Sequence, residues 1–227
     1  MQPELETFKY GINYELMSIN YRLMIKTMEF FTQTAQRILT IVLRNVAGAP
    51  TLAMLAESLS LSHVGVWKAV KKLEAEQFII LKKAGTKENS TYTIHLNWSN
   101  PLVEKTLALA LEHEATKQKR WVHDFAEVGK EVDFLMLYGS ILHSPKEAND
   151  IDVLAVVSKK DGFIRVDKII SKIQISQLRK IHLIDFSSKE LRGELKRPNK
   201  AFLDAFKKGV ILFGQDKFVK FIKEMQQ

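Results

Sequence analysis

Two short apolar runs in the second half of the chain limit its fold more than any other feature. Phe134–Tyr138 and Val153–Val157 are each five residues long, a length that is typical of buried strands and too short for a helix. A glycine and a mostly polar segment separate them, so the chain has to turn between them. The pattern therefore predicts a small sheet built around these two strands.

Paired carboxylates lie where the second run begins. Asp150 and Asp152 are two residues apart on an extended segment, so both side chains point to the same side of the strand. Two such carboxylates repel each other unless a cation lies between them, and hard oxygen ligands favour Mg²⁺ or Mn²⁺. Gly139 and Ser140 form a turn before an expected helix, where free backbone N–H groups suit a triphosphate. We therefore expect a metal site beside a nucleotide-binding turn.

This arrangement resembles the minimal nucleotidyltransferases of the DNA polymerase β superfamily over about residues 121–223. The resemblance rests on Gly139–Ser140 after one strand, on Asp150 and Asp152 at the start of the next, and on the late stretch AFKKGVILFGQDKFVKFIKE. It implies a third carboxylate on a later strand, for which Asp185 is the candidate. By resemblance, Asp185 completes the metal site and takes the proton of the attacking hydroxyl.

The resemblance implies a metal-dependent transfer of a nucleoside monophosphate from a nucleoside triphosphate, ATP by preference, to a hydroxyl acceptor. The acceptor would be a nucleic acid or a protein, such as a toxin-like partner. One departure favours an alternative, because Ile141–Ser144 contains none of the arginines that many minimal members carry after the turn. The alternative is a transcription regulator whose transferase-like domain only senses nucleotide. An enzyme that grips a nucleic-acid substrate with its first half is a third interpretation.

The first half of the chain predicts a helix, a turn, a second helix and a hairpin. Leu52–Leu59 has apolar residues on one helical face, and Ser62 is a good N-cap for a helix over His63–Gln77. Two extended runs follow, Phe78–Lys83 and Thr91–Leu96, and a polar loop joins them.

This order resembles winged helix–turn–helix regulators over about residues 34–98, and the run SHVGVWKAVKKLEAE is similar to the DNA-binding domain of biotin-repressor-type proteins. Residues 61–87 hold six lysines and two glutamates, as expected of a surface that meets DNA phosphates. A winged helix that serves only protein contact is the alternative. The predicted DNA-binding residues, on the second helix and the wing, are His63, Trp67, Lys68, Lys71, Lys72, Lys82, Lys83 and Lys87.

The expected fold class is a two-domain chain. Residues 1–100 would form a mainly α winged helix–turn–helix domain with extra N-terminal helices. Residues 101–227 would form an α+β nucleotidyltransferase domain with a small mixed sheet, entered through a connector helix from Pro101 to Gly129. The apolar length of Tyr14–Val46 predicts a homodimer. The absence of cysteine, of an apolar leader and of any apolar stretch near the ~20 residues of a membrane span predicts a cytoplasmic protein with no membrane partner. The winged-helix pattern and its lysines predict double-stranded DNA as the partner.

Overall fold

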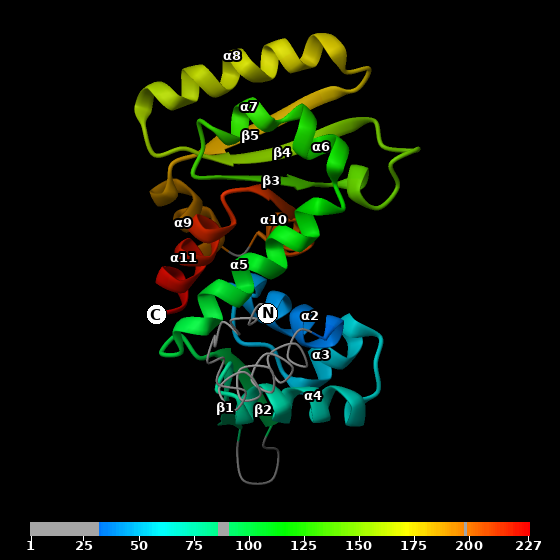
Figure 1. The fold of residues 1–227 in the computed structure, drawn as a ribbon, viewed down its shortest axis with the longest axis vertical. Coiled ribbons are helices and arrows are strands. Elements are labelled where there is room, and N and C mark those ends of the chain that lie inside the picture. Colours follow the sequence, from blue (N-terminus) through cyan, green and yellow to red (C-terminus); the bar gives the residue numbers. More distant parts are fainter. Residues whose placement is uncertain (1–31, 86–90, 198) are drawn as a thin grey trace, which may run out of the picture.

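The computed structural model describes residues 32–85, 91–197 and 199–227. A helical part with a two-stranded sheet lies at one end of the molecule, and a four-stranded sheet flanked by helices lies at the other (Figure 1). The helix α5 runs obliquely between the two parts. The molecule is therefore largely helical with two small sheets.

The first part follows the order expected from the sequence. It contains α2 (Gln33–Arg44), α3 (Leu52–Leu59), α4 (His63–Ala75), β1 (Ile79–Ala84) and β2 (Thr91–Leu96). The two strands pair antiparallel and form the hairpin. The expected helices and strands of this region agree with the structure to within two residues at each end.

The expected connector helix is divided into three. The pattern from Pro101 to Gly129 forms α5 (Pro101–Thr116), α6 (Lys119–Asp124) and α7 (Ala126–Gly129). The apolar residues of α5 belong to the core shared with the first part, whereas Trp121, Phe125 and Val128 belong to a second core. The prediction of one helix was wrong because a straight helix cannot supply both cores, and the chain changes direction after Thr116.

The second sheet is mixed, as the sequence predicts. Its strands are β3 (Phe134–Tyr138), β4 (Asp150–Val156), β5 (Lys180–Phe186) and β6 (Val210–Phe213), in the order β5-β4-β3-β6. β3 pairs antiparallel with β4 and β6, and β4 pairs parallel with β5. A parallel pair needs a crossover connection, and α8 (Lys160–Ser176) provides it.

Helices cover both faces of this sheet. The helices α6, α7 and α8 pack on one face. The helices α9 (Ser188–Lys196), α10 (Lys200–Lys208) and α11 (Gln215–Gln226) pack on the other with α5. The alternation of side chains along each strand explains this division, since successive residues point to opposite faces.

One hydrophobic core runs from the first part of the molecule into the second sheet. Ile38 of α2, Leu107 of α5 and Met136 of β3 are buried in the same cluster, with exposed fractions of 0%, 0% and 1%. This core crosses the expected boundary between residues 100 and 101. The division into two domains stays a prediction.

Candidate functional site

The helix–turn–helix is shaped by three local features. The side chain of Thr51 caps α3 by accepting a hydrogen bond from the N–H of Met54 at 3.3 Å. Ser60 then adopts a left-handed conformation (φ 54°), which ends α3 and turns the chain. Ser62 caps α4, because its Oγ accepts a hydrogen bond from the N–H of Gly65 at 3.2 Å. The cap that the sequence predicts is confirmed.

The second helix has a buried face and an exposed face. Val66, Val70 and Leu73 are at most 2% exposed and fix α4 against α2 and α3. His63 and Lys68 lie on the exposed face. Packing through one face leaves the other free to meet a partner, as a recognition helix requires.

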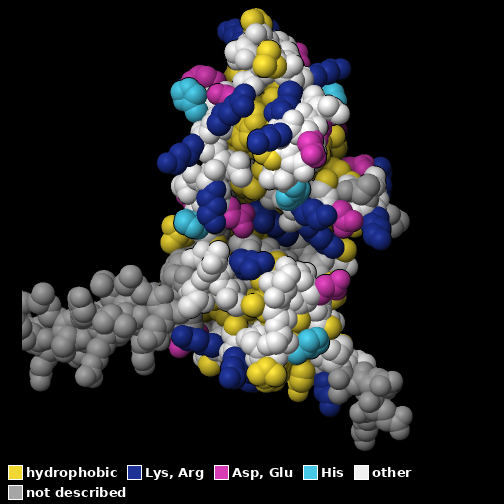
Figure 2. All heavy atoms as spheres, turned by 90° about the vertical axis from the view of Figure 1, so that its right-hand side faces the viewer, with side chains coloured by type: hydrophobic (Ala, Val, Ile, Leu, Met, Phe, Trp, Pro, Cys, Tyr) yellow, Lys and Arg dark blue, Asp and Glu magenta, His cyan; other side chains and the backbone are white. Residues whose placement is uncertain are grey.

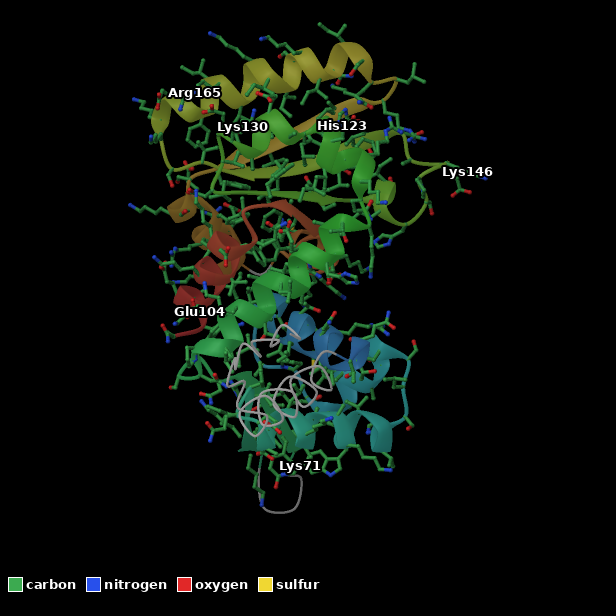
Figure 3. All side chains as sticks on the ribbon, viewed as in Figure 1. Lys71, Glu104, His123, Lys130, Lys146 and Arg165 are labelled. Carbon is green, nitrogen blue, oxygen red and sulfur yellow. The ribbon has the colours of Figure 1, made fainter. Side chains whose placement is uncertain are left out.

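Most of the predicted DNA-contacting lysines are exposed. On α4, Lys71 lies at the end of the molecule farthest from α8 (Figure 3), where it pairs with Glu74. Lys72 is also exposed. Lys82 and Lys83 lie on β1 and are exposed as well. Lys87 lies outside the described residues.

Trp67 occupies a different environment from its neighbours. It is half-buried and packs against the core, with its ring 5.9 Å from the ring of Tyr92 on β2. Its indole therefore holds the helix against the wing, and Lys71 lies 5.5 Å from the centre of the same ring. The structure does not place Trp67 with the exposed residues. Tyr92, which is 43% exposed beside it, is not among the predicted DNA-contacting residues.

Asp150 and Asp152 meet a histidine that the sequence analysis left out of the site. In the parallel pair of β4 and β5, Asp152 lies opposite His182. His182 Nδ1 is 3.3 Å from Asp150 Oδ2 and 3.6 Å from Asp152 Oδ1. One ligand atom from each of the three residues lies within 4.8 Å of the other two.

This spacing fits a cation bound between the three side chains. Ligand atoms at about 2.1 Å from one ion are separated by about 3–4 Å. Two carboxylate oxygens and one imidazole nitrogen suit Mn²⁺ or another transition metal, whereas Mg²⁺ prefers oxygen ligands alone. Without a cation, a protonated His182 would pair with both carboxylates, which is the alternative role for this histidine.

Asp185 is not part of this cluster. It lies opposite Ala155, three residues beyond His182 along β5, a displacement of about 10 Å. Because side chains alternate along a strand, Asp185 also points to the face opposite that of His182. The structure therefore does not bring Asp185, the predicted metal ligand and proton acceptor, together with Asp150 and Asp152, whereas His182 lies beside them.

The turn at Gly139–Ser140 packs directly on the carboxylates. Gly139 has a φ of 84°, and a Cβ at this position would collide with the Asp152 carboxylate. Ser140 is exposed and begins η1 (Ser140–Leu142), a single 3₁₀ turn. The expected helix after the turn is absent from this described segment, where only the single 3₁₀ turn is found, so the backbone N–H groups of a helix start that were expected to bind a triphosphate are not provided.

Electrostatic repulsion and burial act together at this site. Burial and the neighbouring Asp150 raise the pKa of Asp152, while His182 opposes the shift. Burial, Asp152 and Asp150 raise the pKa of Tyr138 to about 12, so its hydroxyl is protonated at neutral pH. The cluster therefore holds negative charge that a cation would relieve.

The elements from α2 to β2 follow the order of a winged helix–turn–helix. Comparisons with known proteins gave few matches. No protein-family model and no curated protein matches the chain. Three solved structures do. A MepR mutant from a multidrug resistant S. aureus clinical isolate is 18% identical, with a TM-score of 0.34, over 50% of this chain and 84% of that one. The adhesin competence repressor AdcR of Streptococcus pyogenes is 15% identical, with a TM-score of 0.33, over 72% and 95%. A Lactococcus lactis ZitR mutant in apo form is 18% identical, with a TM-score of 0.27, over 72% and 96%.

The comparisons do not support the functional prediction. The three matched structures are named as MepR, as an adhesin competence repressor and as ZitR, and none is named as a nucleotidyltransferase. The predicted transfer of a nucleoside monophosphate is contradicted, since no nucleotidyltransferase is among these matches. The two-domain nucleotidyltransferase arrangement is not confirmed, and neither nucleotide nor a toxin-like partner finds support. Among the described residues, no helix has the length and apolar character of a membrane span.

Proposed function

We propose that the chain is a transcription regulator that binds double-stranded DNA through α4 and the wing. The observation that carries this proposal is the exposed face of α4. It presents His63, Lys68 and Lys71 to solvent on a helix whose other face is fixed by buried side chains. The exposed Lys82 and Lys83 lie on the adjoining wing, where DNA phosphates would flank a helix in the major groove.

Binding to two duplexes tests this function. The full chain is titrated with a fragment from upstream of its own gene and with a scrambled duplex of equal length. A regulator should prefer its site by ~10³-fold or more. Lys68→Ala should weaken specific binding by ~1–3 kcal/mol and binding to the scrambled duplex by less.

The matched control is Lys172→Ala, which removes an exposed lysine of α8 at the opposite end of the molecule. It should leave both affinities unchanged. If the chain binds neither duplex at low salt, the winged helix is a protein-contact module, and the proposal of a DNA-binding regulator is wrong.

The cluster of Asp150, Asp152 and His182 supports a second part of the proposal. We propose that it binds a divalent cation, with Mn²⁺ preferred to Mg²⁺ because one ligand is an imidazole. Phosphate oxygens of a nucleoside triphosphate would then fill the remaining coordination positions. The regulator would thus sense nucleotide at this site, next to Gly139 and Ser140, without turnover.

Metal titration monitored by the electron paramagnetic resonance of Mn²⁺ tests the cluster. His182→Ala should lower the affinity for Mn²⁺ by about tenfold, equivalent to about 1.4 kcal/mol, and Asp152→Ala should abolish binding. His143→Ala is the control, since His143 lies outside the cluster. Unchanged Mn²⁺ binding in His182→Ala would show that the histidine is only an ion-pair partner. ATP binding should require the cation and be lost in Asp152→Ala.

A further inference from the structure

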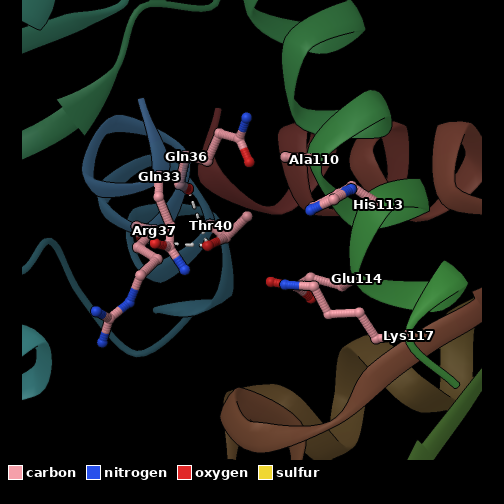
Figure 4. A pocket seen from close by; sticks show the side chains of 8 residues that line it. All are labelled: Gln33, Gln36, Arg37, Thr40, Ala110, His113, Glu114 and Lys117. Atoms are coloured by element: carbon pink, nitrogen blue, oxygen red, sulfur yellow. Dashed lines mark hydrogen bonds between the residues drawn. The ribbon is translucent and has the colours of Figure 1, made fainter. Parts of the chain in front are cut away.

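Two adjoining cavities lie where the winged-helix part meets the rest of the molecule. The first, of about 440 Å³, lies between α2 and α5 (Figure 4). The second, of about 460 Å³, lies between α2 and the end of α10. Both are lined by Arg37, Thr40 and Glu114, so they form one depression, which we call the waist groove. Each cavity is large enough for a small ligand.

The walls of the waist groove are strongly cationic. Among the described residues that line it, Glu114 is the only acidic one, and the positively charged ones are Arg37, Arg44, Lys117, Lys207 and Lys208. Figure 2 shows Lys and Arg side chains where the molecule narrows between its two parts. A cleft with low-dielectric walls concentrates the field of such charges.

Most of this positive charge is not neutralised by ion pairs. Glu114 pairs with Arg44, with 2.6 Å between Oε2 and Nη2. Within the described ranges, Arg37, Lys117, Lys207 and Lys208 take part in no ion pair. Four like charges around one depression repel each other, and a bound anion would relieve that repulsion.

A buried donor in the same groove also lacks a partner. Arg44 lines the second cavity with a side chain that is 11% exposed. Its Nε is buried and has no hydrogen-bond partner among the described residues. A buried N–H group without a hydrogen bond is costly, and an acceptor atom from a ligand in the groove would satisfy it once the Arg44 side chain turns toward the cavity.

We propose that the waist groove binds a small polyanion of the di- or triphosphate class, held between the winged-helix part and the rest of the molecule. The guanidinium of Arg37 comes from α2, the ammonium of Lys117 from the end of α5, and those of Lys207 and Lys208 from α10. A ligand bound by all of them bridges the helix that packs behind α4 and the helices that cover the four-stranded sheet. This site is separate from the cluster at Asp150 and needs no metal.

Calorimetric titration of the full chain with inorganic triphosphate tests the proposal. The solution contains EDTA, so that the metal-dependent site cannot contribute, and its ionic strength is low. The parent should bind the anion, and the affinity should fall as salt rises. Arg37→Gln and the double variant Lys207→Gln/Lys208→Gln should each weaken binding on the order of tenfold, because they remove cations from opposite walls.

Further variants distinguish binding in the groove from binding at the metal cluster and from diffuse attraction to surface lysines. Glu114→Gln should strengthen binding, since it removes a carboxylate from the groove and retains an acceptor for Arg44. Asp152→Asn and the α8 control Lys172→Gln should bind like the parent. The proposal is overturned if the parent does not bind in EDTA, if the groove variants bind like the parent, or if Asp152→Asn abolishes binding. Circular dichroism of each variant confirms that it is folded.

Discussion

Gly139 occupies a position where a side chain would be costly for two reasons. Its φ of 84° lies in the region that favours glycine, and a Cβ would collide with the Asp152 carboxylate. From the sequence, this glycine is predicted to be part of a phosphate-binding turn. The structure supplies a packing reason that holds whether or not a phosphate binds there.

Replacement of two glycines by alanine tests this packing. Gly139→Ala should destabilise the protein by about 1–3 kcal/mol, through backbone strain and displacement of Asp152. Gly193→Ala is the matched control, because Gly193 lies inside α9, where an added Cβ would have no atom within 4 Å. It should instead stabilise the protein by up to about 1 kcal/mol. Urea unfolding of the two variants measures both effects, and equal midpoints would contradict this account of Gly139.

At the scale of elements, α4 and the wing should contribute differently to DNA binding. Lys82 and Lys83 lie on β1, and we expect them to contact phosphates. Lys83→Gln should then weaken binding to specific and scrambled duplexes equally and reduce the slope of log K against log salt by about one unit. Lys172→Gln is the control. A loss confined to the specific duplex would instead indicate that the wing reads bases.

The elements of the winged helix could be predicted because their signals are local. The cap at Ser62 and the spacing of Val66, Val70 and Leu73 fix the start and the buried face of α4 within a few residues of chain. The contact of Trp67 with Tyr92 of β2 could not be predicted in this way, since Tyr92 is distant from it in the sequence.

The candidate metal site could likewise be predicted only where its signal is local in the sequence. Asp150 and Asp152 were found because their spacing is visible within one strand. The third ligand depends on the register between β4 and β5, which places His182 and not Asp185 opposite Asp152. A shift of one residue would change the face of every side chain on β5.

Lys207 and Lys208 could not be recognised in the sequence as more than ordinary surface lysines, because only the fold places them in a groove.

At the scale of the whole molecule, less apolar surface is available for the predicted homodimer than the sequence suggests. The apolar length of residues 14–46 predicts that the two chains are joined through this segment. The apolar side of α2, including Ile38, Leu39 and Leu43, is buried within the chain's own core. Residues 14–31 lie outside the described residues. They are the part of the predicted dimer contact that is not accounted for by the core.

Light scattering tests where a dimer contact lies. The full chain should have twice the mass of one chain, and Leu23→Glu should shift it toward the monomer. Val64→Glu is the control, because Val64 is 65% exposed on α4, outside the segment assigned to the contact. A monomeric parent at tens of micromolar concentration would show that the dimer prediction is wrong.

The ion pair between Arg44 and Glu114 joins α2 to α5. Because Arg44 is mostly buried, Glu114→Ala should lower the free energy of unfolding by about 2 kcal/mol. Glu127→Ala removes the partner of Lys130 in a pair whose side chains are 68% and 67% exposed, and it should cost less than about 1 kcal/mol. Thermal unfolding of the two variants measures the difference. Equal costs would mean that the Arg44 pair adds no more than a surface contact.

The continuous core has a consequence for how such a chain can evolve. Ile38 and Leu43 of α2 share one buried cluster with Leu107 of α5 and with Phe134 of the four-stranded sheet. Neither half buries all of its apolar surface by itself, so a gene fusion that exchanged one half for an unrelated one would leave uncovered apolar surface on both sides. The two halves of this chain are therefore expected to be inherited together, as a single unit of recombination.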